Sequence, residues 1–154
     1  MDGDGGRILD RVRNLAAIAL ACEQVGGAQA CLDMSVDYAK IRYQFGRPIG
    51  SFQAIKHMCA DMLLEIESAR SAAYSAGWAA ADQDDDLPAV ASLAKAYCSD
   101  AYFNAARNTI QIHGGIRFTW EHDAHLYFKR AKSSELFLGD PSYHREQYLQ
   151  RSGL

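Results

Sequence analysis

Proline, strand-like alternation and paired cysteines are scarce or missing in this sequence. Its 154 residues include only three prolines, so few positions force a helix to end. We find no segment whose apolar residues alternate as a strand requires. The four cysteines, Cys22, Cys31, Cys59 and Cys98, show no CxxC spacing. They fall within expected helices, which predicts reduced core residues of a cytoplasmic protein rather than a disulfide framework.

An excess of one charge sign is also missing. The formal net charge is −3, which is too small to favour nucleic acid or a membrane surface as a partner. We find no apolar run that approaches a membrane span, and no signal peptide. We therefore expect neither a nucleic-acid partner nor a membrane partner.

The sequence is instead rich in small apolar residues placed at helical spacing. Residues 1–7 predict a flexible leader, and residues 8–154 predict one domain. In the first long segment the apolar stripe steps by three and four, through Leu15, Ile18, Cys22, Val25, Leu32, Val36 and Ala39. We expect helices over residues 8–43, 52–81, 88–113, 119–138 and 141–150. The fold class is thus all-α, a four-helix up-and-down bundle with one extra shorter helix.

Several local features refine this expectation. Ser51, Thr119 and Asp140 are predicted N-caps, and Gly114-Gly115 is a predicted C-cap pair. We expect the mid-helix pair Gly26-Gly27 to allow close approach of another backbone. In the third helix Val90, Leu93, Tyr97, Ala101 and Ile110 are expected to face inward. Apolar residues outside the first helix's stripe, Leu20, Cys31 and Met34, predict self-association.

The stretch from Arg42 to Gln53 carries the strongest chemical signal. It holds two arginines and Pro48, and Gly46 and Gly50 can take the positive φ values that a tight reversal needs. Arg42 and Arg47 could hold a phosphate or pyrophosphate beside exposed loop amides. The alternative is a solvated basic corner in which Arg42 only complements the helix dipole.

Other candidate chemistry is weaker. His122 and His125 lie one turn apart but have no further ligands that close a metal site, so we expect none. No pair of carboxylates indicates acid–base catalysis. Gln111 and the tandem glycines before Arg117 could admit a ligand close to the backbone.

These segments together resemble the C-terminal domain of the acyl-CoA dehydrogenases. The resemblance is carried by Arg42-Tyr43-Gln44-Phe45-Gly46-Arg47-Pro48-Ile49 with Phe52-Gln53, by Ala60-Asp61-Met62, and by Gln111-Ile112-His113-Gly114-Gly115. It covers residues 8–150, and the leader resembles the linker before this domain. The resemblance implies FAD as cofactor and an acyl-CoA thioester as substrate in the full assembly. It also implies contacts of the adenosine diphosphate end of FAD with the bundle of a neighbouring subunit.

The resemblance assigns roles to particular residues. Arg42 corresponds to the arginine that pairs with the pyrophosphate of FAD, and Gln44 and Phe45 to the residues beside it. Gln111, Gly114 and Gly115 correspond to the segment that receives the adenine side and the adjacent phosphate. These are the expected cofactor-binding residues.

The catalytic base of the family is missing from both of its known positions. The family's late glutamate falls at Leu138, before Gly139, and the alternative base position on the first helix falls at Ala16. Neither side chain accepts a proton. The chain is similar to a bacterial subgroup, some of whose members pair with a second, base-bearing subunit. Two interpretations remain: a domain of an FAD-dependent acyl-CoA dehydrogenase that is inactive alone, or a non-catalytic structural subunit that clamps FAD. We expect a homo-oligomer or a base-bearing partner.

Overall fold

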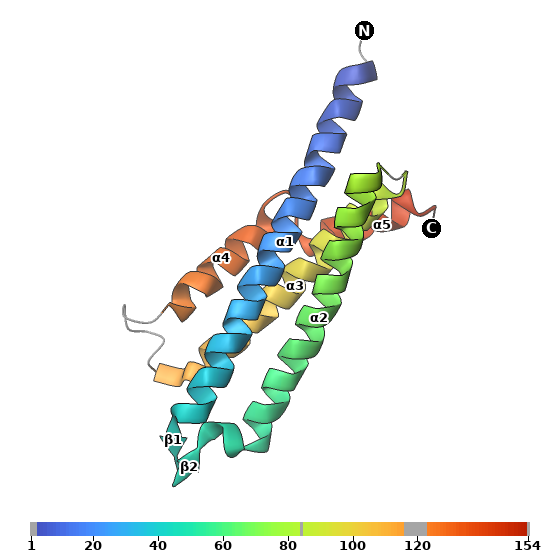
Figure 1. The fold of residues 1–154 in the computed structure, drawn as a ribbon. Helices are drawn as coiled ribbons and strands as arrows, with labels where there is room; N and C mark the ends of the chain where they lie inside the picture. Colours follow the sequence, from blue (N-terminus) through green and yellow to red (C-terminus); the bar gives the residue numbers. More distant parts are fainter. Residues whose placement is uncertain (1–2, 84, 116–122, 154) are drawn as a thin grey trace.

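The computed structural model describes residues 3–83, 85–115 and 123–153, and it is almost entirely helical. Its helices are α1 (Gly3–Ile41), α2 (Gln53–Asp82), α3 (Leu87–His113), α4 (Ala124–Leu136) and α5 (Pro141–Arg151), with a short 3₁₀ turn, η1 (Ile49–Ser51), before α2. Figure 1 shows α1 and α2 running antiparallel, with α4 and α5 on the other side of α3. The predicted all-α bundle is confirmed.

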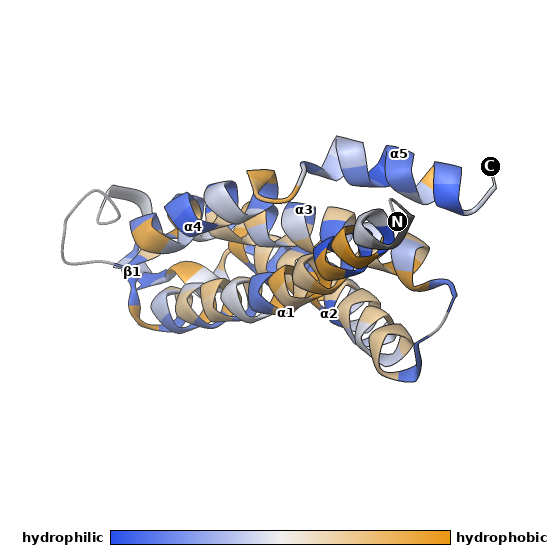
Figure 2. Cartoon of the chain, turned by 90° about the horizontal axis from the view of Figure 1, so that it is seen from above, coloured by the Kyte–Doolittle hydropathy of each residue, from blue (hydrophilic) through white to orange (hydrophobic). Residues whose placement is uncertain are grey.

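Helix α3 is the centre of the bundle. It contacts each of the other four helices, whereas α5 packs chiefly against α3. Figure 2 shows that α5 is mainly hydrophilic, as expected for a helix that covers the outside of the bundle. Arg151 near the end of α5 fixes it to α3, because its Nη1 donates to Pro88 O and to Ser92 Oγ, each at 2.8 Å.

Small side chains let the three long helices approach one another closely. One core cluster is mostly alanine from α1, α2 and α3, including Ala21, Ala73 and Ala94. In the second cluster the ring of Tyr102 packs on Gly27, where an added Cβ would lie 2.5 Å from Tyr102 Cζ. The predicted close approach at the glycine pair therefore exists, but the neighbour is an aromatic side chain rather than another backbone.

Polar side chains occupy positions in the core that apolar residues were expected to fill. Leu93 and Tyr97 are exposed, contrary to the prediction, while Lys95 and Ser99 are fully buried. Gln24 Nε2 donates to Ser99 Oγ at 3.0 Å, which links α1 to α3 inside the bundle. The buried face of α3 is thus rotated from its most apolar face, because these hydrogen bonds satisfy the polar groups.

The ends of the elements differ in places from those predicted. Helix α1 begins at Gly3 rather than near residue 8. Phe52, not Ser51, is the N-cap of α2, and no side chain caps that helix. Asp140 caps α5 as predicted, since Tyr143 N donates to its carboxylate at 2.7 Å. Thr119 lies outside the described residues, and α4 begins at Ala124.

Exposed apolar residues lie elsewhere than predicted. Leu20 and Cys31 are buried, so they do not supply a surface for self-association. Exposed apolar residues include Ile8, Leu9 and Val12 on the end of α1 that extends beyond the bundle, and Leu64, Tyr74 and Trp78 on α2. All four cysteines are free, as predicted, but Cys22 is exposed.

Helix α1 departs from the expectation that no apolar run approaches the length of a membrane span. By length and composition Gly5–Ile41 could cross a membrane, although half of its most apolar window is buried inside the bundle. A core helix has the same composition, so this feature is weak evidence for a span.

Candidate functional site

The corner between α1 and α2 is a small β-hairpin, which the sequence did not predict. Strands β1 (Tyr43–Gln44) and β2 (Arg47–Pro48) pair antiparallel, with Gln44 opposite Arg47. Phe45 and Gly46 form the turn, with φ values of 52° and 77°. Two consecutive positive φ values are typical of a type I′ turn, which usually takes Asn-Gly rather than Phe-Gly.

Glycines 46 and 50 serve different purposes in this corner. Gly46 has the predicted positive φ. Gly50 does not; a Cβ there would lie 2.9 Å from Ala39 O, so this glycine is needed where η1 crosses α1. The hairpin is closed by Ile49 N, which donates to Arg42 O at 2.8 Å. The position of Arg42 is therefore fixed by its backbone.

The side chains of the hairpin are turned towards solvent. Phe45 is 91% exposed, although a bulky residue with positive φ is unfavourable. The guanidinium of Arg47 makes a cation–π contact with Phe52, because its Cζ lies 4.1 Å from the centre of the Phe52 ring. Arg42 is exposed, and its guanidinium has no hydrogen bond or ion pair with any residue that the structure describes. Of the two arginines proposed to bind an anion, Arg42 is therefore the one whose guanidinium has no partner among the described residues.

The second predicted corner lies at the same end of the bundle. The rings of Tyr38, near the end of α1, and His113, the last residue of α3, stack with centroids 4.4 Å apart. Gln111 is exposed, and Gly114 ends α3 with a φ of 61°. A Cβ added to Gly114 or Gly115 would meet nothing within 4 Å among the described residues.

These two corners have the chemistry that a dinucleotide such as FAD would use. A guanidinium without a partner suits phosphate oxygens, and an exposed aromatic ring suits a flat heterocycle. Gln44 is less available, because its Nε2 donates to Tyr43 O at 2.7 Å. Arg42 and Phe45 have side chains compatible with the cofactor, and the assignment of all six residues to it stays a prediction.

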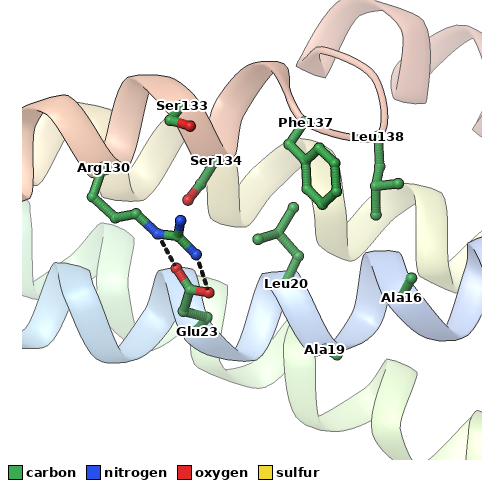
Figure 3. Close-up of a pocket in the computed structure, with 9 residues that line it drawn as sticks. All are labelled: Ala16, Ala19, Leu20, Glu23, Arg130, Ser133, Ser134, Phe137 and Leu138. Atoms are coloured by element: carbon green, nitrogen blue, oxygen red, sulfur yellow. Dashed lines mark hydrogen bonds and ion pairs between the residues drawn. The ribbon is translucent and has the colours of Figure 1, made fainter.

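A separate pocket lies between α1, α4 and the segment that joins α4 to α5. It measures about 460 Å³, within the usual range of ligand pockets. Nine residues line it: Ala16, Ala19, Leu20, Glu23, Arg130, Ser133, Ser134, Phe137 and Leu138. Figure 3 shows Leu138 above Ala16, so the two positions that the resemblance assigns to the family's base line one pocket. Neither side chain can move a proton.

The carboxylate in this pocket belongs to Glu23, and Arg130 holds it in two hydrogen bonds. Arg130 Nε and Nη2 donate to the two carboxylate oxygens at 2.7 and 2.6 Å (Figure 3). These bonds hold the pKa of Glu23 below its usual value, so it is a poor proton acceptor. The sequence analysis missed this pair, because 107 positions separate the two residues and no local pattern links them.

The segment after α4 has positive φ values at two residues and is held by hydrogen bonds from buried side chains. Leu138 and Gly139 have φ values of 65° and 108°. The buried ammonium of Lys95 donates to Glu135 O and Gly139 O, each at 3.1 Å, and to Ser99 Oγ at 2.9 Å. His144 Nε2 lies 3.1 Å from Leu138 O and must be the donor, since a carbonyl oxygen only accepts. Burial lowers the pKa of Lys95 to about 8 and also lowers that of His144.

No metal centre is present among the described residues, where no three acidic, histidine or cysteine side chains gather. His122 lies outside the described residues. His125 is partly buried at the start of α4.

The hairpin and the pocket are too far apart to form one site in a single chain. Glu23 and Ile41, the end of α1, are separated by 18 residues, or about 27 Å at 1.5 Å per residue. A small ligand therefore cannot contact both regions of one chain at once.

Comparison with known proteins identifies the family of this chain. Residues 3–153 match the family model described as acyl-CoA dehydrogenase, C-terminal domain. The chain is 49% identical over 130 residues to the acyl-CoA dehydrogenase IpdE2 of Mycobacterium tuberculosis, covering 84% of this chain but 39% of IpdE2. This chain therefore spans about two fifths of the length of that relative.

Solved structures show the same fold within longer chains. The Tcur3481–Tcur3483 steroid ACAD superposes with a TM-score of 0.87 at 34% identity, covering 91% of this chain and 38% of the other. The ChsE4–ChsE5 complex of Mycobacterium tuberculosis gives 0.86 at 28% identity, covering 92% and 38%. With a family model that matches nearly every residue, the chain belongs to the acyl-CoA dehydrogenase family and corresponds to its C-terminal domain.

Proposed function

We propose that this chain supplies the C-terminal bundle of an FAD-dependent acyl-CoA dehydrogenase. The hairpin and the end of α3 contact the phosphates and adenine of FAD, and the pocket between α1 and α4 takes the acyl group of the substrate. The observation that carries the proposal is the pocket, because it brings both family base positions, Ala16 and Leu138, to one point. The uncommitted guanidinium of Arg42 supports the cofactor contact.

The proposed reaction is the α,β-dehydrogenation of an acyl-CoA thioester. FAD, when bound, accepts the hydride that leaves the β-carbon of the acyl group. The apolar side chains at the reaction end of the pocket exclude water from the acyl chain. This chain orients the acyl group, but it offers no base there, because Glu23 is held by Arg130. The α-proton that leaves as the hydride leaves the β-carbon therefore passes to a base supplied by a partner chain.

A second candidate follows from that missing base: a non-catalytic subunit that clamps FAD for a partner. It is favoured by the separation of about 27 Å along α1 between Glu23 and the start of the hairpin, since the hairpin would serve the active site of a neighbouring chain. The ChsE4–ChsE5 structure is a complex of two different chains. In either candidate the chain works in an oligomer, and its four free cysteines lead us to propose the cytoplasm.

A single substitution separates the two candidates. Leu138→Glu restores a carboxylate at the family's late base position, with Ala16→Glu as the matched variant for the other position. We expect the unmodified chain, purified alone, to reduce no dye with a panel of acyl-CoAs. If Leu138→Glu confers dye reduction in the FAD-loaded assembly beyond that of the unmodified assembly, the pocket is a complete site that lacks only a base. No gain in either variant favours the non-catalytic subunit.

Association is tested separately by light scattering at roughly tens of micromolar, a range that reveals ordinary oligomer affinities. We expect a species larger than a monomer. A monomer that also fails to bind a base-bearing partner would contradict both candidates.

The steroid description of the Tcur3481–Tcur3483 relative suggests where to begin the search for a substrate. We propose that ring-bearing acyl-CoAs be compared with linear ones of similar length. A pocket of about 460 Å³ has room for either class.

A further inference from the structure

One end of the pocket between α1 and α4 is polar, and the dehydrogenation does not explain it. Ser134 is only 2% exposed, and its hydroxyl makes no hydrogen bond of normal geometry among the described residues, although it lies close enough to the Glu23 carboxylate to help lower the pKa of that group. Buried hydroxyls usually make well-formed hydrogen bonds, so a weakly bonded one beside a pocket has capacity left for a ligand. Figure 3 shows that Ser134 points from α4 towards the pair of Glu23 and Arg130.

Arg130 leaves a second unused group at the same end. Its Nε and Nη2 are taken by Glu23, while Nη1 has no partner among the residues described. The positive charge is already balanced by the Glu23 carboxylate, which would repel a second anion. A neutral oxygen fits better, because a hydroxyl can accept from Arg130 and either donate to or accept from Ser134.

The rest of the pocket is apolar and sets the distance to this polar end. Ala19, Leu20 and Phe137 lie between it and the reaction end at Ala16 and Leu138. Ala16 and Glu23 are seven residues apart on α1, which corresponds to about 10 Å along the helix. A ligand that fills the pocket is therefore apolar for roughly that length and then meets hydrogen-bonding groups.

We propose that Ser134 and Arg130, with Glu23, recognise a hydroxyl group at the far end of the acyl chain. This inference rests on the proposed function, in that it assigns the pocket to an acyl group, and it makes these residues specificity determinants. The ligand class is an acyl-CoA that carries one neutral hydroxyl about 10 Å beyond its reacting carbons, the span between Ala16 and Glu23 at 1.5 Å per residue.

The test compares the binding of matched acyl-CoAs to the FAD-loaded assembly by calorimetry. One pair is ω-hydroxydodecanoyl-CoA and dodecanoyl-CoA; a ring-bearing pair is lithocholoyl-CoA and cholanoyl-CoA, which also differ by one hydroxyl. We expect the hydroxylated member of at least one pair to bind about tenfold more tightly, about the effect of one well-formed hydrogen bond to a charged group. Equal affinities within both pairs would overturn the inference.

Two serine variants localise the effect. Ser134→Ala should abolish the preference and change stability little, because the hydroxyl that it removes makes no well-formed hydrogen bond within the described protein. Ser133→Ala is the matched control, since Ser133 lines the same pocket but is exposed, and it should keep the preference. A preference that survives Ser134→Ala overturns the role of Ser134.

Binding and turnover are measured separately, so the two proposals can fail independently. A hydroxyl preference in binding without any flavin reduction supports this inference and contradicts the dehydrogenase assignment of this pocket. Flavin reduction by both members of each pair at equal affinity does the opposite. If no acyl-CoA binds, the inference is wrong.

Discussion

Phe45 and Leu138 have nearly the same backbone conformation in very different surroundings. Each has a positive φ, 52° and 65°, and each is followed by a glycine that also has a positive φ. Phe45 lies at the tip of a hairpin and is almost fully exposed. Leu138 is partly buried and lies in a segment that Lys95 and His144 hold from inside the bundle.

The difference shows which strained turn the fold itself needs. The turn at Leu138 is fixed by buried donors, so changing it should lower stability. The turn at Phe45 has no such support, and it places a large ring in solvent at an energetic cost. We infer that the hairpin is shaped for a ligand, whereas the Leu138 segment is shaped by the core.

The sharpest test is the pair Gly139→Ala and Gly46→Ala. Both place a side chain at a positive φ, but a Cβ at Gly139 would lie 2.5 Å from Tyr143 Cδ1, whereas a Cβ at Gly46 meets nothing within 4 Å. We expect Gly139→Ala to lower the free energy of unfolding by about 3 kcal/mol and Gly46→Ala by about 1 kcal/mol. Equal losses in urea denaturation would remove the distinction between the two turns.

Lys95→Met tests the support of the Leu138 segment. It leaves the carbonyls of Glu135 and Gly139 without a donor, so we expect a loss of about 2 kcal/mol at pH 7. Wild-type stability at pH 7 in the Lys95→Met variant would show that the ammonium does not hold the segment.

The same variant tests how the free energy of unfolding depends on pH. The pKa of Lys95 is about 8 in the folded state against an ordinary value of 10.5. Between these two pH values the unfolded chain binds a proton that the folded chain does not. The contribution of Lys95 to the free energy of unfolding therefore increases as the pH rises through this range. Cys31 and Cys98 act oppositely above pH 9, because burial raises their pKa values to about 12. The difference in unfolding free energy between wild type and Lys95→Met isolates the lysine, and it should increase above pH 8.

Arg42 tests the hairpin as a cofactor contact. Arg42→Ala should weaken FAD binding by about 1.5–3 kcal/mol, because a charged hydrogen bond to phosphate is lost, while Arg42→Lys should lose less. Lys40→Ala is the control, since Lys40 is exposed at the same end and contacts Asp37. Titration of FAD into the full assembly at constant ionic strength gives the affinities. If all variants retain FAD equally, Arg42 only complements the helix dipole.

The smallest expected effect is that of Phe45→Gly. Its unfolding free energy should stay within about 1 kcal/mol of wild type, because relief of strain offsets the added flexibility. FAD affinity should fall by about 1 kcal/mol through the loss of an aromatic contact. If Phe45→Gly lowers the free energy of unfolding and leaves FAD affinity unchanged, the hairpin serves the fold rather than a ligand.

The sequence predicted the helices well, because apolar residues at steps of three and four are a local signal. It did not predict the hairpin, whose strands of two residues are too short for a pattern. It also placed Leu93 and Tyr97 in the core instead of Lys95 and Ser99. A polar side chain is buried only when partners from distant segments meet it, and Lys95 is bound by carbonyls 40 and 44 positions away.

The candidate site could be predicted only in part for the same reason. The residues of the two corners are contiguous in sequence, so their chemistry could be read locally. The meeting of Ala16 with Leu138 in one pocket could be seen only in the fold, and so could the pair of Glu23 and Arg130.

Helix α1 carries both the hairpin and one wall of the pocket, so its length sets the distance between them. No turn or loop interrupts the 18 residues from Glu23 to Ile41. One inserted residue would rotate the hairpin by about 100° around the helix axis relative to the pocket, whereas seven would return it to within about 20°. Seven residues would, however, also lengthen the helix by about 10 Å. Insertions in this half of α1 should therefore disturb the relation between the hairpin and the pocket, and chimaeras that exchange bundle domains should be joined before Ala16 or after Phe52.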